Sequence, residues 1–91
     1  MDPQAKTRLR EIIAVELQVP TDKVRSGLSL RKHLGMDSVA ALNILFAAEE
    51  TFGIHVPEGE LEHVDEIDAI MALIERYRAA PTAGAAASRR S

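Results

Sequence analysis

The chain has 91 residues, with 14 acidic and 11 basic side chains and a net charge of −3. Its composition, 46% hydrophobic and 27% charged, is that of an ordinary globular domain and excludes disorder of the whole chain. The absence of cysteine excludes disulfides and thiolate metal sites. The sequence also lacks the basic stripe interleaved with aromatic residues that would indicate nucleic-acid binding. We therefore expect one small domain that does not bind nucleic acid.

The first segment predicts an amphipathic helix that begins at Asp2 and Pro3 and is ended by Pro20. Asp2 can cap the first turn, and proline is favoured at the first helical position. Apolar residues recur along the segment at helical spacing: Leu9, Ile12, Ile13 and Leu17. Charged residues interrupt the segment throughout, so we expect neither a signal peptide nor a membrane span, and we expect a cytoplasmic protein.

Residues 21–36 show no sustained helical or strand period and predict a long first loop. A connection of this length in a compact domain needs a reason. Apolar residues within it can pin it to the core: Val24, Leu28, Leu30 and Leu34.

A second helix is predicted from about Ser38 to Phe52, capped by Asp37 and ended by Gly53. Its middle is almost entirely apolar, and a domain this small cannot surround it on every side. One stripe continues into Ile54 and Val56 and is predicted to face the core: Ala41, Ile44, Leu45, Ala48 and Phe52.

The opposite stripe of this helix is predicted to face outward, because carboxylates stand at its end. It comprises Val39, Leu42, Asn43, Phe46, Glu49 and Glu50. Contiguous exposed apolar side chains of this kind are typical of a binding surface, although the same residues could instead pack beneath the long loop.

The remaining elements are a short turn around residues 58–62, after Pro57, and a last helix that starts near Asp65, with Asp68 at the positive end of its dipole. The inner face of the last helix is predicted to be Ile67, Ile70, Met71, Ile74 and Tyr77. The fold class is therefore all-α, a small four-helix bundle of three main helices and one short helix with a long first loop. We predict that the helical domain covers residues 1–78 and that residues 79–91, rich in Ala, Gly, Ser and Arg, form a disordered tail.

Ser38 stands at the tip of the second helix, where its hydroxyl is predicted to be free. An Asp-Ser pair at a helix start is common, and by itself it indicates no more than a cap. The longer segment "LGMDSVAALNILFAAEETFGIHVPEGEL" resembles the acyl carrier proteins. Their attachment motif is Gly-x-Asp-Ser-Leu at the start of the second helix, followed by Glu-Glu-x-Phe and by x-Ile-Pro or x-Val-Pro. The resemblance covers roughly residues 5–78.

The resemblance implies that Ser38, flanked by Asp37 and Val39, carries a 4'-phosphopantetheine arm that a phosphopantetheinyl transferase takes from coenzyme A. The thiol of the arm would hold an acyl group as a thioester for acyl-loading and acyl-processing enzymes: synthases, ligases or transferases. The implied protein is a monomeric, non-catalytic carrier for fatty acid, polyketide or specialised lipid biosynthesis. The outward stripe of the second helix occupies positions that partner enzymes read in the family.

The chain also departs from the family pattern. Val39 follows the serine where leucine or methionine is usual, and Asn43 replaces a carboxylate of relatives with acidic second helices. Residues 31–33 are basic where many relatives are acidic. These departures favour a dedicated set of enzymes that rely on apolar contact.

Two other functions stay open at this point, an aminoacyl or peptidyl carrier and an unmodified helical adaptor that binds only through the exposed face. A hydrolase would need a base and an oxyanion site beside the nucleophile, and the proximity of His33, Asp37 and Ser38 in the sequence does not establish them. His55 and His63 lie outside any metal-ligand spacing. We therefore expect neither a catalytic site nor a metal site.

Overall fold

The computed structural model describes residues 3–79, which form four α-helices and no strand. The helices are α1 (Pro3–Leu17), α2 (Leu30–Leu34), α3 (Ser38–Phe52) and α4 (Ile67–Ala79), and two 3-10 segments, η1 (Thr21–Lys23) and η2 (Glu58–His63), stand between them. The all-α fold with three main helices and one short helix is confirmed. The predicted cap Asp2 and residues 80–91 of the predicted tail lie outside the described residues, and a domain boundary at residue 78 stays a prediction.

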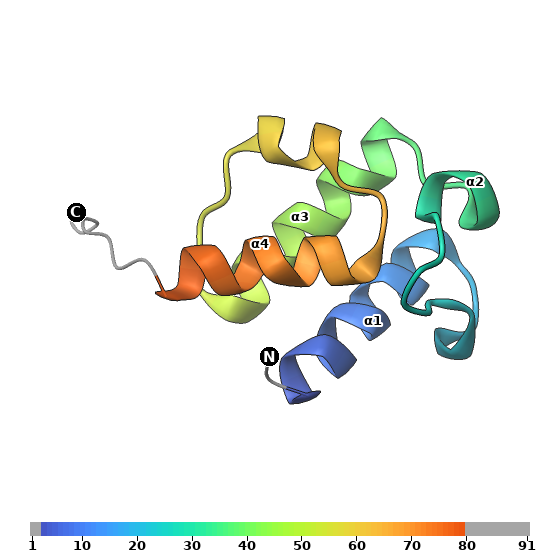
Figure 1. Ribbon diagram of the computed structural model, residues 1–91, viewed down its shortest axis with the longest axis horizontal. Helices are drawn as coiled ribbons and strands as arrows, with labels where there is room; N and C mark the ends of the chain where they lie inside the picture. Colours follow the sequence, from blue (N-terminus) through green and yellow to red (C-terminus); the bar gives the residue numbers. More distant parts are fainter. Residues whose placement is uncertain (1–2, 80–91) are drawn as a thin grey trace.

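The three long helices enclose one core (Figure 1). α1 packs against α3 and α4, and α3 also contacts α4 and η2. In Figure 1, α4 crosses in front of α3, and α2 lies at the end of the bundle where α3 begins. The side chains that are buried most completely come from all four helices and from two connecting segments: Leu9, Ile13, Val24, Leu30, Ile44, Val56, Ile67, Met71 and Ile74.

The predicted inner faces of the helices are confirmed. In α1, Leu9 and Ile13 are buried, and Ile12 and Leu17 are partly buried. In α3, only Phe52 of the predicted stripe is partly rather than fully buried. In α4, Tyr77 is likewise partly buried, while the four aliphatic residues of the predicted face are buried.

α1 ends earlier than Pro20. Gln18 adopts a left-handed φ of 59°, and the backbone N–H groups of Gln18 and Val19 donate to the carbonyl groups of Val15 and Ala14, at 3.3 and 3.0 Å. These two hydrogen bonds are those of a Schellman motif, which satisfies the last carbonyl groups of a helix. The helix is thus ended by its own C-terminal cap, and Pro20 follows when the turn is complete.

Residues 21–36 are not a plain loop, because they contain η1 and α2. With only five residues, α2 is too short to show a helical period in the sequence. Ser29 caps it by accepting from the backbone N of Lys32 at 3.1 Å, and Gly35 ends it with a left-handed φ of 73°. The predicted attachment to the core is confirmed for Val24 and Leu30, which are buried in it, and for Leu34, which packs against it. Leu28 is half-buried, and its predicted contact with the core stays a prediction.

The turn predicted around residues 58–62 is confirmed as η2, but α4 begins at Ile67 rather than near Asp65. The carboxylate of Asp65 is directed to the start of α2 instead. Asp68 does lie in the first turn of α4, where it also pairs with Lys6 of α1 at 2.8 Å. Within residues 3–79, no helix has the length and hydropathy that a membrane span requires. The cytoplasmic location stays a prediction.

Candidate functional site

Ser38 is the first residue of α3, and its side chain is exposed. The residue before it, Asp37, is the N-cap, and its Oδ1 accepts a hydrogen bond from the backbone N of Ala40 at 2.8 Å. This cap decides that the helix begins at Ser38. The Ser38 hydroxyl therefore stands where the unpaired N–H groups and the dipole of a 15-residue helix favour a negative charge.

The residues before Ser38 turn the chain from α2 into α3. Gly35 adopts the left-handed conformation that ends α2, which is strained for a residue with a side chain. The next residue, Met36, is buried, and its backbone N donates to the Leu30 carbonyl at 3.0 Å. Glycine makes the turn, methionine anchors it and aspartate caps the helix, so that the serine is presented to solvent.

A hollow of about 210 Å³ opens beside Ser38. Its lining residues come from three elements: Arg31 from α2, Ser38, Ala41 and Leu42 from α3, and Leu61 and Glu62 from η2. Three of these side chains are apolar, and Arg31 and Glu62 bring opposite charges to the lining. The hydroxyl thus lies at a partly apolar depression rather than on a flat surface.

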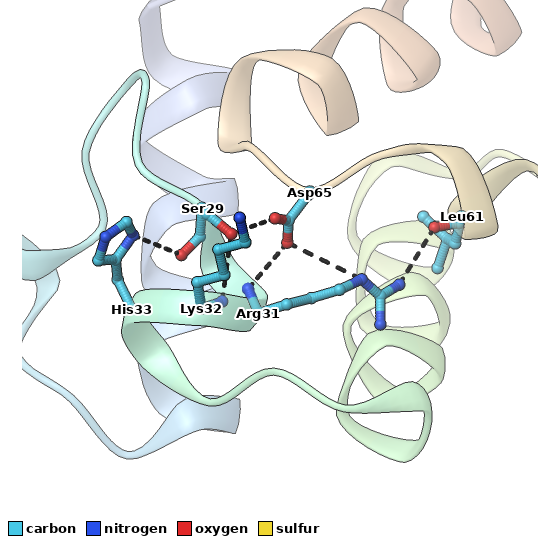
Figure 2. A network of polar contacts seen from close by, with 6 residues as sticks. All are labelled: Ser29, Arg31, Lys32, His33, Leu61 and Asp65. Carbon is cyan, nitrogen blue, oxygen red and sulfur yellow. Dashed lines mark hydrogen bonds and ion pairs between the residues drawn. The ribbon is translucent and has the colours of Figure 1, made fainter.

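Asp65 fastens α2 to the segment between η2 and α4 (Figure 2). Its carboxylate accepts hydrogen bonds from the Ser29 hydroxyl and, at 2.8 Å, from the backbone N of Arg31. The Asp65 carbonyl accepts from the backbone N of Leu30, also at 2.8 Å. Through these bonds one residue joins α2 to the segment that directly follows η2, and α2 and η2 both contribute lining residues of the hollow.

The network of Asp65 also changes its acidity. Partial burial raises the pKa of the Asp65 carboxyl, but the hydrogen bonds from Ser29 and the Arg31 backbone and the charges of Arg31 and Lys32 outweigh it. The pKa consequently lies below its ordinary value of 3.8. Asp65 is therefore ionised at neutral pH, as its role as a hydrogen-bond acceptor requires.

The predicted outward stripe of α3 is only partly exposed. Val39 and Phe46 leave 68% and 49% of their surface exposed, and Asn43 and Glu50 are exposed as well. Leu42 is half-buried, because it packs against the core, and it also lines the hollow beside Ser38. Asn43 is tied to α1, since its Nδ2 donates to Glu16 Oε2 at 2.9 Å.

The predicted outward orientation of Glu49 is wrong. Its side chain is only 18% exposed, and its Oε2 accepts from the backbone N of Val56 at 2.8 Å. The same oxygen lies 3.2 Å from Nδ1 of His55. The carboxylate turns toward the chain after Gly53 because the N–H of the buried Val56 needs an acceptor there. Glu49 therefore serves the fold, and its role in partner binding stays a prediction.

Comparison with known proteins decides the family. Residues 7–74 match the family described as "Phosphopantetheine attachment site". The chain belongs to the acyl carrier protein family. This carrier is 33% identical to an acyl carrier protein of Akkermansia muciniphila over 77 residues, which cover 85% of the carrier and 96% of the relative. It is also 36% identical to "Acyl carrier protein 3, chloroplastic" of Cuphea lanceolata over 70 residues, which cover 77% of the carrier and 49% of the relative.

The cofactor of the family, 4'-phosphopantetheine, fits the surroundings of Ser38. The arm is joined through a phosphodiester, which is an anion, and Ser38 offers an exposed hydroxyl at a helix start that favours negative charge. Arg31 brings a positive charge to the same hollow, and Leu42 and Leu61 bring apolar surface. When bound, the group supplies a thiol that can carry an acyl chain.

The other polar side chains near Ser38 in the sequence are engaged elsewhere in this carrier. Nδ1 of His33 lies 3.2 Å from the carbonyl oxygen of Ser29, as Figure 2 shows, and the Asp37 carboxylate caps α3. Neither interaction involves the Ser38 hydroxyl. Across the described range 3–79, no three histidine, aspartate or glutamate side chains gather as metal ligands would.

The sequence indicated that residues 31–33 are basic and lie just before the motif, but it did not single out Arg31 as the one that lines the hollow. It also did not reveal Leu61 and Glu62 as lining residues or the network of Asp65. A local signal for α2 was present, because Ser29 and Gly35 stand where an N-cap and a C-terminal glycine belong. The contact of α2 with Asp65 had no local signal, since 34 positions separate Arg31 from Asp65.

Proposed function

We propose that this carrier holds an acyl intermediate as a thioester on a 4'-phosphopantetheine arm attached to Ser38. The observation that supports the site best is the exposed Ser38 hydroxyl at the capped start of α3, inside the segment that matches the attachment-site family. Asp37 and Val39 flank the attachment, Asp37 by setting the start of the helix and Val39 by its exposed apolar side chain.

The carrier itself performs no chemistry on its cargo in this proposal. His33 and Asp37 are bonded to backbone groups, and the chain contains no cysteine whose thiol would compete for the acyl group. The acyl group belongs to fatty acid, polyketide or specialised lipid biosynthesis. The similar proteins are acyl carrier proteins by name, which favours an acyl over an aminoacyl or peptidyl cargo.

The proposed partners are a phosphopantetheinyl transferase and the enzymes that load and process the acyl group. They would approach Ser38 over the exposed part of α3, where Val39 and Phe46 offer apolar contact and Asn43 and Glu50 offer polar contact. Because this surface carries few charges, recognition relies on shape and apolar burial more than on long-range attraction.

The attachment is tested by incubating the protein with coenzyme A, Mg²⁺ and a phosphopantetheinyl transferase and measuring its intact mass. The wild type should gain one arm, and Ser38→Ala should gain none. Ser26→Ala is the matched control, because Ser26 is another exposed serine, bonded to Lys6 at 2.6 Å, and its loss should leave the modification intact. An arm on Ser38→Ala would refute the site, and an unmodified wild type would favour the helical adaptor.

The cargo is tested on protein purified from its native host. Its intact mass reports the loaded arm, and cleavage of the thioester with hydroxylamine releases the group for mass analysis. A fatty or polyketide acyl product supports the proposal. An amino acid or peptide in its place would show an aminoacyl or peptidyl carrier.

A further inference from the structure

We propose that Arg31 binds the phosphodiester of the arm and holds the arm against the hollow beside Ser38. The proposal rests on the attachment of the arm to Ser38. It makes Arg31 a positioning residue, one that directs the arm along the carrier instead of leaving it free in solvent. The role is specific to Arg31 among the three consecutive basic residues of α2.

Arg31 is the residue with a positive charge among the described residues that line the hollow with Ser38. A phosphodiester on Ser38 Oγ would place its negative charge at the mouth of that hollow. The start of α3 and the guanidinium both attract this charge, while Glu62, which lines the hollow from η2, repels it. The phosphate is therefore favoured on the side of Arg31.

The backbone of Arg31 is held firmly, and its guanidinium is held loosely. The backbone N donates to Asp65 Oδ1 at 2.8 Å, and the preceding Leu30 N donates to the Asp65 carbonyl at the same distance. By contrast, Nε lies 3.8 Å from Asp65 Oδ1, and Nη2 lies 3.5 Å from the Leu61 carbonyl. Both contacts are drawn as dashed lines in Figure 2. Ordinary N–H···O bonds measure about 2.7–3.2 Å, so the contacts of the side chain are long and weak.

A phosphate oxygen offers the guanidinium a better partner than these contacts. Hydrogen bonds between a guanidinium and a phosphate are charge-assisted and can be bidentate. The Leu61 carbonyl is a neutral acceptor, and the Asp65 carboxylate, although charged, lies 3.8 Å from Nε, which is beyond hydrogen-bond distance. The side chain of Arg31 is 36% exposed, so it can turn without unpacking the core. α2 stays in place during this turn, because Asp65 holds it through Ser29 and through backbone N–H groups.

The neighbours of Arg31 supply matched controls. Lys32 and His33 belong to the same five-residue helix, yet neither lines the hollow. Lys32 is exposed, and its backbone N donates to the Ser29 hydroxyl. Lys32→Gln therefore removes one positive charge near Ser38 without touching the proposed contact, and Arg31→Gln removes the same charge from the hollow.

The experiment compares apo and holo forms of the wild type, Arg31→Gln, Arg31→Lys and Lys32→Gln. Intact masses establish first that each holo form carries one arm. The ³¹P shift of the phosphodiester and the apo-to-holo change in thermal midpoint are then measured at low and high salt. We expect Arg31→Gln to move the ³¹P shift away from the wild-type value and to lose the holo-specific change in midpoint. Arg31→Lys should be intermediate, and Lys32→Gln should match the wild type.

A second measurement does not depend on any variant. In the wild type, the Nε–Hε resonance of Arg31 should shift between the apo and holo forms, and the shift should shrink at high salt because exposed charges are screened. The proposal is overturned if attachment succeeds while that resonance stays unmoved, or if Arg31→Gln and the wild type have the same ³¹P shift. If the wild type accepts no arm, the proposed function fails, and this inference fails with it.

Discussion

Phe46 leaves 49% of its surface exposed, whereas Ile44, two positions earlier in α3, leaves only 1% exposed. Their truncations should therefore differ. We expect Phe46→Ala to change the free energy of unfolding by less than about 1 kcal/mol. Ile44→Ala should lower the free energy of unfolding by about 2–5 kcal/mol. Chemical denaturation measures both values. A loss of about 3–5 kcal/mol for Phe46→Ala would show that Phe46 belongs to the core.

The variant Phe46→Ala also tests the partner surface. If Val39 and Phe46 form the apolar part of this surface, Phe46→Ala should weaken binding of a native partner enzyme although the fold is intact. Binding of holo protein, measured by calorimetry, is the readout. Unchanged affinity would remove Phe46 from the proposed surface.

Glu49 and Glu50 are adjacent carboxylates with different roles. Glu49 Oε2 accepts from the N–H of Val56, a residue that is 1% exposed, while Glu50 is exposed. Glu49→Ala leaves that N–H without its acceptor and should lower the free energy of unfolding by about 1–3 kcal/mol. Glu50→Ala should stay within about 0.5 kcal/mol of the wild type. Equal denaturation midpoints for the two variants would contradict the assigned role of Glu49.

At the scale of the helix, α3 is defined by its two ends. Asp37 caps the first turn, and Gly53, with a φ of 67°, ends the last turn by donating its N–H to the Glu49 carbonyl at 2.8 Å. Asp37→Ala should lower the free energy of unfolding by about 1 kcal/mol, because it removes the cap. Asp37→Asn should retain most of the stability that the cap provides, because asparagine caps a helix about as well as aspartate. Urea titration of the three proteins separates the two outcomes. A large loss in Asp37→Asn would mean that the charge, rather than the cap, matters.

The element that periodicity did not reveal, α2, is held by contacts rather than by its own propensity. Five residues cannot form a stable helix alone, since helix initiation is costly. Ser29, Gly35 and Asp65 together satisfy its ends, and Leu30 is buried in the core. The position of Arg31 beside Ser38 thus depends on Asp65, a residue that is distant in the sequence.

At the scale of the whole molecule, the contacts of Asp65 predict how stability depends on pH. Because the pKa of Asp65 is lowered in the folded state, a falling pH protonates this carboxyl in the unfolded chain at a higher pH than in the folded chain. The contribution of Asp65 is therefore fully present above the unfolded value of 3.8 and is lost as pH falls through the folded pKa. Thermal midpoints between pH 6 and pH 2.5 should fall less steeply for Asp65→Asn than for the wild type.

Asp68 contributes to the same fall, because hydrogen bonds from Lys6 and Ser26 lower its pKa as well. The difference between the wild type and Asp65→Asn isolates the contribution of Asp65 to the pH dependence, since both proteins retain Asp68. Parallel midpoint curves for the two proteins would show that the contacts of Asp65 do not contribute to the pH dependence. At neutral pH, Asp65→Asn should also lower stability, because it removes a charged acceptor at the start of α2.

Features set by neighbours along the chain could be predicted from the sequence alone. The cap at Asp37, the left-handed Gly53, the span of α3 and the inner faces of the long helices all follow from signals within a few residues. The attachment-site segment was recognisable for the same reason, because its motif is contiguous. These features depend on local hydrogen bonds and on the helical period.

Other features were decided by tertiary structure, because they join distant residues. Ser29 and Arg31 meet Asp65 across 36 and 34 positions, and Asn43 meets Glu16 across 27. The hollow beside Ser38 exists only when α2, α3 and η2 come together around one core. The sequence by itself determined the helices and the serine at the tip of α3, and only packing determined the side chains beside that serine, since a local pattern carries no information on which distant groups satisfy one another.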